Sequence, residues 1–382
     1  MVQPLSWDIF CRVVDNFGDA GVCWRLAKQL ADEYRARVRL FIDGLQSLHA
    51  LNPDVALVPQ QSLDNVEVRD WQRPFGADFA ADIVVEAFGC GLPDAYVAAM
   101  DQAARASVWI VLEYLSAEAW VREHHGLPSP HPRFARRRYF FFPGFTEGTG
   151  GVLRERDLFS RRDAFNEARR AQYWRALGYD MPPDAATVVS LFAYDTAPIA
   201  ALLDTWSNNE APVVALVPQS RAADAAVAHL RGGAGMPRVL RRGALELRVV
   251  PFVPQREYDE LLWACDCNFV RGEDSFVRAQ WAARPFVWHI YPQADQAHRA
   301  KLEAFLERYS AGLEPETARA AADMMRAWNQ TAGRAVTVRS AWAEYAPRLA
   351  AFRQHGAAWA DRLAGIGDLA GNLAQFCSEK LK

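Results

Sequence analysis

The fold is decided by a stretch near the start of the chain, residues 7–34, which reads WDIFCRVVDNFGDAGVCWRLAKQLADEY. Residues 7–14 form an apolar run that ends in two valines, which is typical of a buried strand. Residues 15–19 are turn-forming, and Val22, Leu26 and Leu30 then recur at helical spacing. A buried strand that leads through a short loop into an amphipathic helix predicts a parallel, doubly wound α/β sheet.

This alternation continues along the chain and restarts after a Pro182-Pro183 break. A length of 382 residues suits two domains better than one core. We therefore predict a Rossmann-like domain over residues 1–180 and a second over 184–359. The predicted strands cover residues 38–42, 83–88, 108–112, 139–142, 187–192, 213–217, 247–253, 267–270 and 286–290, and the predicted helices lie near 93–106, 199–206, 257–264 and 276–283.

Composition indicates a globular protein without a general attraction to polyanions. Hydrophobic residues make up 51% of the chain and the formal net charge is -3. The basic run 136–138 precedes an apolar strand and is interpreted as a solvated helix end rather than a nucleic-acid patch. We expect neither a nucleic-acid nor a membrane partner.

The six cysteines show no zinc-like spacing and suit a reducing cytosol. The start of the sequence has no signal-peptide pattern, and no apolar run approaches the length of a membrane span. We expect a cytoplasmic protein. His124 and His125 are adjacent and do not share a helix face, so no histidine is assigned to a metal site.

The first candidate site is the loop after the first predicted strand. Gly18 and Gly21 supply only part of the glycine pattern of a dinucleotide site. Asp15 and Asp19 would repel a pyrophosphate there, but they suit a proton acceptor or a holder of a cationic substrate. The alternative is structural, with Asp15 capping a turn or Asp19 capping the helix.

The second candidate is the loop 271–275, Arg-Gly-Glu-Asp-Ser, which opens a predicted helix. Free N–H groups at a helix start and the forked donors of Arg271 are suited to a phosphate. Glu273 and Asp274 then bind sugar hydroxyls or pair with Arg271. The alternative is an ordinary N-cap with favourable acids in the first turn.

Aromatic residues follow two other strands of the second half. Phe252 is a candidate to stack on a base, and Tyr194 to donate to a phosphate oxygen, although aromatics at strand ends usually belong to the core.

The two acidic loops carry a family resemblance. The segment 7–19, WDIFCRVVDNFGD, and the segment 271–275, RGEDS, are similar to two signatures of the bacterial protein-arginine rhamnosyltransferases that modify elongation factor P, the EarP family. The resemblance extends over nearly the whole chain. Ala20 departs from it only in being smaller than expected, which concerns packing.

The resemblance implies a GT-B glycosyltransferase fold, with two Rossmann-like domains facing across a cleft. It also implies a metal-independent, inverting enzyme without a cofactor. The donor would be dTDP-β-L-rhamnose and the acceptor one arginine of elongation factor P. The acceptor side would be the N-terminal domain, and the last helix, about 360–382, would pack back onto it.

The resemblance and the chemistry together suggest residue roles. Asp19 is the expected base, Asp15 steers the guanidinium or shapes the loop, and Glu273 holds the donor or aligns the sugar. Phe252 is expected to stack on thymine. The expected donor-binding residues are Asn16, Phe17, Gly18, Phe192, Tyr194, Phe252, Val253, Pro254, Gln255, Arg271, Gly272, Asp274 and Ser275.

Three alternative functions differ from this one in the substrate or in the class of protein. One is a GT-B transferase with another nucleotide sugar and a small-molecule acceptor. Another is a non-catalytic partner of a translation factor, which the intact acidic motifs disfavour. A Rossmann oxidoreductase is disfavoured by the missing first glycine.

Overall fold

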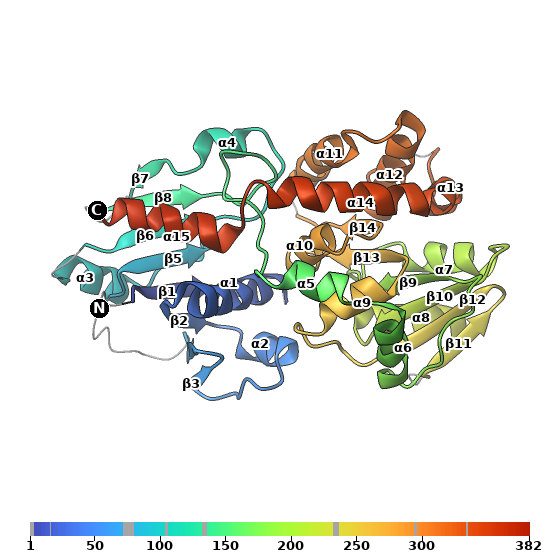
Figure 1. The fold of residues 1–382 in the computed structure, drawn as a ribbon, viewed down its shortest axis with the longest axis horizontal. Coiled ribbons are helices and arrows are strands. Elements are labelled where there is room, and N and C mark those ends of the chain that lie inside the picture. Colours follow the sequence, from blue (N-terminus) through green and yellow to red (C-terminus); the bar gives the residue numbers. More distant parts are fainter. Residues whose placement is uncertain are drawn as a thin grey trace. The chain divides into compact units, whose positions relative to one another are not determined.

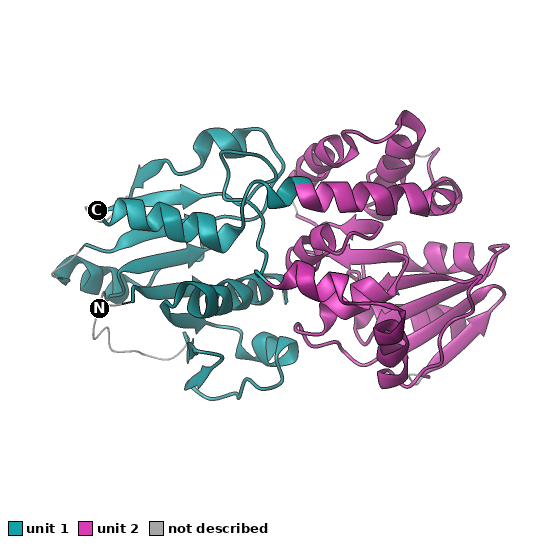
Figure 2. Cartoon of the chain, in the orientation of Figure 1, with its two compact units in different colours: residues 1–156, 362–382 teal, residues 157–361 magenta. Residues whose placement is uncertain are grey.

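The computed structural model describes residues 4–15, 17–71, 80–103, 106–131, 136–231, 237–293, 296–333 and 335–382. The chain divides into two compact units, coloured separately in Figure 2. The first comprises residues 1–156 and 362–382, and the second residues 157–361.

Within the described residues, the first unit contains an eight-stranded sheet in the order β3-β4-β2-β1-β5-β6-β8-β7 (Figure 1). The six inner strands are parallel, and only the edge strands β3 and β7 pair antiparallel. The strands are β1 (Ser6–Cys11), β2 (Arg37–Ile42), β3 (Gln60–Leu63), β4 (Val66–Asp70), β5 (Ile83–Ala87), β6 (Val108–Leu112), β7 (Pro128–Pro130) and β8 (Arg137–Phe141). The helices are α1 (Gly18–Tyr34), α2 (Leu45–Leu51), α3 (Asp94–Gln102), α4 (Trp120–His124) and α15 (Leu369–Lys380).

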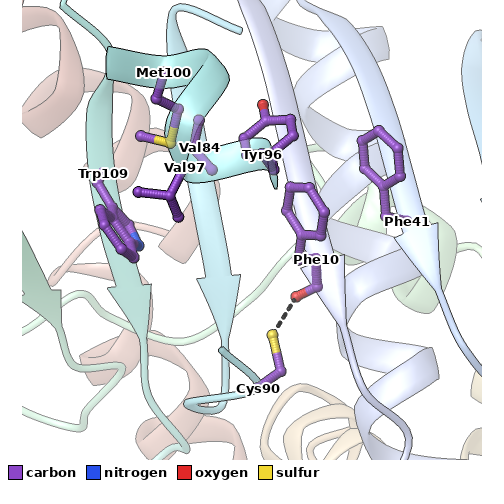
Figure 3. Close-up of a cluster of buried hydrophobic side chains, with 8 residues drawn as sticks. All are labelled: Phe10, Phe41, Val84, Cys90, Tyr96, Val97, Met100 and Trp109. Carbon is purple, nitrogen blue, oxygen red and sulfur yellow. Dashed lines mark hydrogen bonds between the residues drawn. The ribbon is translucent and has the colours of Figure 1, made fainter. Parts of the chain in front are cut away.

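An aromatic cluster packs one face of the central strands against α3 (Figure 3). The Phe10 ring stacks on Phe41 of the neighbouring strand with centroids 4.5 Å apart. Tyr96 of α3 meets the Phe10 ring edge-on at 4.7 Å. Strands β5 and β6 are buried at every residue, as expected for parallel strands covered on both faces, which explains why residues 83–85 and 108–112 are continuous hydrophobic runs in the sequence.

One ion pair is buried in this sheet. Asp8 of β1 accepts two bonds of 2.6 Å from the guanidinium of Arg39 in β2, and the Tyr96 hydroxyl also donates to it. The side chains of Asp8 and Arg39 are only 1% and 12% exposed.

The second unit contains a six-stranded sheet in the order β11-β12-β10-β9-β13-β14. Among its described strands, only the edge strand β11 runs antiparallel. The strands are β9 (Thr187–Leu191), β10 (Val213–Pro218), β11 (Val239–Arg242), β12 (Leu245–Val250), β13 (Cys267–Arg271) and β14 (Phe286–His289). The helices are α5 (Leu158–Asp163), α6 (Glu167–Ala176), α7 (Ile199–Ser207), α8 (Arg221–Arg231), α9 (Tyr258–Ala264), α10 (Asp274–Trp281), α11 (Ala297–Ser310), α12 (Pro315–Trp328), α13 (Val338–Tyr345), the short η1 (Ala346–Arg348) and α14 (Leu349–Ala364).

The chain first passes from the first unit into the second between residues 156 and 157, whereas the sequence analysis ended the first domain at residue 180. Helices α5 and α6 join the second unit because they pack on α9. Arg161 pairs with Asp259 at 3.3 Å, and Arg170 donates to the Ala264 carbonyl at 3.1 Å.

The end of the chain belongs to the first unit. Helix α15 packs on α1, where Gln29 donates to the Asp368 carboxylate that caps α15. Among the helices of the described residues, none combines the length and apolar character that a bilayer crossing needs.

Replacing Asp8 by asparagine keeps the side-chain shape and removes the carboxylate that binds the Arg39 guanidinium through two hydrogen bonds. We expect the free energy of unfolding to fall by about 3–5 kcal/mol. Urea denaturation followed by tryptophan fluorescence measures it.

The matched control is Arg241→Gln, which breaks the pair with Glu246. The Arg241 side chain is 72% exposed, so the change should stay below about 1 kcal/mol. An Asp8→Asn protein as stable as this control would contradict the importance of the buried pair.

Candidate active site

Both candidate loops lie at the edges where parallel strands end. The loop from Arg12 to Phe17 follows β1, and residues 88–91 and 113–116 follow β5 and β6. Because β1, β5 and β6 are neighbouring parallel strands, these three loops share one edge of the first sheet.

Asp19 closes the first loop. It lies in the first turn of α1 and is fully buried. Its Oδ2 accepts the backbone N–H groups of Val14 and Asp15 at 2.7 and 2.9 Å, and its Oδ1 accepts the Tyr114 hydroxyl at 3.1 Å. The carboxylate therefore fixes the loop that precedes its own helix.

The same bonds shorten the first strand. The sequence predicted it over residues 7–14, but it ends at Cys11. The N–H groups of Val13 and Val14 donate to the carboxylates of Asp43 and Asp19 instead of a neighbouring strand.

The other residues of this loop lie around Asp19. Asp15 and Phe17 are half-buried and Gly18 is buried. The Asp15 carbonyl accepts the Gly18 N–H at 2.7 Å, which makes the turn. Phe17 occupies the N-cap of α1 without a side-chain cap bond, so Asp19 does not act as the N-cap. Asn16 lies outside the described residues.

Two aromatic residues at this edge were not singled out from the sequence. Phe88 follows β5 with φ of 56°, in the left-handed region, and Tyr114 follows β6. Their rings stack with centroids 4.3 Å apart and planes inclined by 13°. Both are half-buried, and together they form an aromatic wall beside Asp19. In the sequence, the signal that could have identified them is that each lies at or just after the end of a predicted buried strand, 83–88 or 108–112.

The second candidate loop is closed in a similar way. The Ser275 hydroxyl accepts the Arg271 N–H at 2.9 Å and donates to the Arg271 carbonyl. Gly272 has φ of 59°, a conformation that glycine tolerates best. Its N–H donates to the His289 carbonyl at 3.1 Å, and its carbonyl accepts the Trp288 indole N–H at 2.9 Å.

The two acids of this loop differ in their surroundings. Glu273 is half-buried and occupies the N-cap of α10 without a side-chain cap bond. Asp274 is buried, accepts Gln255 Nε2 at 2.7 Å and pairs with Arg278 at 3.3 Å. Arg278 also pairs with Asp259 at 2.9 Å. Asp274 thus fixes the Gln255 amide within a buried ionic network.

Arg271 lies over two of the expected aromatics. Its guanidinium carbon is 4.6 Å from the ring centroid of Phe192 and 4.4 Å from that of Tyr194. Phe192 and Val253 are buried, while Tyr194, Phe252 and Pro254 are half-buried. The second unit therefore gathers Phe192 and Tyr194, which follow β9, and Arg271, the last residue of β13, at one edge of its sheet. Residues 252–255 follow β12 at the same edge.

A metal site was not expected from the sequence. Within the described ranges, no group of three or more His, Cys, Asp and Glu residues is placed to hold a metal ion.

Comparison with known proteins identifies the family. A model of the family described as Elongation-Factor P (EF-P) rhamnosyltransferase EarP matches residues 7–378. A protein-arginine rhamnosyltransferase of Pseudomonas putida is 48% identical over 329 residues, covering 85% of this chain and 86% of the relative. One of Shewanella oneidensis is 42% identical over 343 residues, covering 85% and 86%.

A solved structure, "Structural basis for EarP-mediated arginine glycosylation of translation elongation factor EF-P", is similar to this chain with a TM-score of 0.69 and 34% identity. The similarity covers 98% of this chain and 99% of that one. Together with the two parallel-rich sheets, it confirms the predicted α/β, GT-B fold class. The chain is an enzyme, a glycosyltransferase that belongs to the EF-P rhamnosyltransferase EarP family.

Proposed function

We propose that the chain transfers L-rhamnose from dTDP-β-L-rhamnose to the guanidinium of one arginine of elongation factor P, with inversion at the sugar carbon. Family membership supports the transferred sugar and the type of acceptor. The observation that carries the mechanism is the Asp15–Asp19 loop with its aromatic wall. An acceptor that is a translation factor implies a cytoplasmic reaction.

The acidic loop suits a guanidinium acceptor. Arginine stays cationic at any usable pH, and its planar group stacks on aromatic faces. The rings of Phe88 and Tyr114 offer such a face next to the carboxylate of Asp19. Asp15 precedes Asp19 in the same loop and is more exposed, so we assign it to steering the guanidinium.

Asp19 is assigned the role of base. Its Oδ2 already accepts two backbone N–H groups, whereas within the described residues its Oδ1 accepts only the Tyr114 hydroxyl. Oδ1 therefore has a lone pair for the substrate proton. Because Asp19 is fully buried, the Tyr114 side chain or the loop must shift when the guanidinium arrives.

In the proposed step, a guanidinium nitrogen attacks the sugar carbon from the face opposite the diphosphate. The new nitrogen–carbon bond forms as the carbon–oxygen bond to the diphosphate breaks, and Asp19 takes the proton. Positive character at the sugar carbon is expected, as in glycoside cleavage. Glu273, half-buried at the start of α10, is assigned to aligning the sugar.

The donor is assigned to the second unit. Arg271 and Tyr194 are suited to the diphosphate, and Phe252 to stacking on thymine. The Ser275 hydroxyl is occupied by the loop, so we assign the backbone N–H groups at the start of α10, at Asp274 and Ser275, to the phosphate oxygens. In this proposal these groups offset the charge of the departing diphosphate, and no metal is needed.

The direct test is incubation of the purified chain with dTDP-β-L-rhamnose and elongation factor P. Intact-mass and fragment mass spectrometry should place one deoxyhexose on one arginine. Unmodified elongation factor P would support the non-catalytic alternative, and binding of UDP in place of dTDP would support the alternative donor.

We predict that Asp19→Asn lowers the rate of transfer by at least about 100-fold, the usual scale for a lost general base. Binding of dTDP, measured by calorimetry, should stay within about 3-fold of the original chain. Asparagine still accepts the loop N–H groups through its amide oxygen, so the loop should stay closed.

Asp43→Asn is the matched control, because Asp43 closes the same loop through the Val13 N–H. It should retain most of the activity. Equal losses in the two variants would mean that Asp19 acts only by holding the loop.

Tyr114→Phe tests whether the hydroxyl positions Asp19. The aromatic wall is kept, but the hydrogen bond that stabilises the carboxylate is lost. We expect kcat to fall about 10-fold, with KM for elongation factor P nearly unchanged. An unchanged kcat, or a fall in kcat matched by an equal loss of dTDP binding, would mean that the hydroxyl does not position Asp19 for the reaction.

A further inference from the structure

A buried histidine adjoins the second candidate loop. His289 is the last residue of β14, and strand register places it beside Arg271 of β13. It is only 2% exposed. Its ring lies 5.3 Å from the Tyr194 ring and 5.9 Å from that of Trp328, measured between centroids. In Figure 1, β13 and β14 lie side by side within the second unit.

Its hydrogen bond fixes the position of the ring proton. The Tyr194 backbone N–H donates to His289 Nδ1 at 3.3 Å. A backbone N–H can only donate, so Nδ1 carries no proton and the neutral ring carries its proton on Nε2. Burial, with Arg271 nearby, lowers the pKa of His289 to about 3, so the ring is neutral at physiological pH.

The Nε2–H group is a donor without a protein acceptor. Within the described residues it donates to no protein atom, and it is not one of the unpartnered polar atoms that are sealed from solvent. The donor therefore opens to solvent from an otherwise buried ring, where an acceptor that arrives with a ligand can take the place of water. The guanidinium of neighbouring Arg271 is also a donor, whereas the Tyr194 N–H is already used by Nδ1.

We propose that His289 binds the diphosphate of the nucleotide donor directly, donating a neutral hydrogen bond from Nε2–H to a phosphate oxygen. The proposal rests on the proposed function, in that the donor is a nucleoside-diphosphate sugar. Phosphate oxygens only accept hydrogen bonds, so they suit a group of donors better than sugar hydroxyls do. A neutral ring adds a donor beside Arg271 without placing a second positive charge there.

Two substitutions of His289 test the contributions of its two ring nitrogens separately. In His289→Asn, the amide oxygen takes the place of Nδ1 and still accepts the Tyr194 N–H, but the Nε2–H donor is lost. In His289→Gln, the amide N–H group reaches the position of Nε2. Dissociation constants for dTDP and for thymidine, which lacks phosphate, are measured by calorimetry for each variant.

We expect His289→Asn to weaken dTDP binding by about 10- to 100-fold, the range for a bond to a charged acceptor, while thymidine binding stays within about 2-fold. His289→Gln should restore dTDP binding to within about 5-fold of the original chain. Equal weakening for dTDP and thymidine would mean that His289 only supports the fold, and would overturn the proposal, as would unchanged dTDP binding in His289→Asn.

The outcome also distinguishes this proposal from the proposed function. If the original chain binds UDP rather than dTDP, the assigned donor fails, and the same comparison with UDP and uridine decides the role of His289. If the original chain binds dTDP but His289→Asn binds it equally well, only the role of His289 fails. An original chain that binds no nucleoside diphosphate overturns both.

Discussion

Each candidate loop is held shut by a side chain from the first turn of the helix that it opens. In the first unit the Asp19 carboxylate accepts the N–H groups of Val14 and Asp15. In the second, the Ser275 hydroxyl bridges the N–H and carbonyl of Arg271. A loop at the end of a buried parallel strand has backbone groups without sheet partners, and leaving them unpaired would be costly. The same side chains that satisfy these groups also fix the neighbouring polar residues in place.

This constraint explains why the two loops differ chemically. A carboxylate that closes the loop brings negative charge to the first sheet edge, which suits a cation. A hydroxyl that closes the loop leaves the second edge to Arg271 and to the positive end of the α10 dipole, which suits an anion. The buried network of Gln255, Asp274, Arg278 and Asp259 supports the second edge, and its two carboxylates are balanced by Arg278 and by Arg161, which pairs with Asp259.

Much of this arrangement follows from local sequence. The strand–loop–helix pattern of residues 7–34 predicted a parallel sheet, because a buried parallel strand is apolar throughout. The acids and Arg271 were recognised because they follow such strands. Phe88, Tyr114 and His289 were not, because an aromatic or histidine beside an apolar strand has the same pattern in a core as in a site. Their roles depend on which strands are neighbours, and β1, β5 and β6 are far apart in sequence. The unit boundary moved from 180 to 156 for a similar reason, because α5 and α6 are placed by contacts with α9.

The first unit is built from two segments separated by the whole of the second. Helix α15 supplies Phe376, whose ring lies 5.6 Å from that of Phe141 in β8, and Asp368, which binds Gln29 of α1. During synthesis on the ribosome, residues 1–156 therefore emerge long before the helix that covers them. Until residues 362–382 appear, this half of the enzyme has an uncovered apolar surface, so its folding cannot be completed one domain at a time.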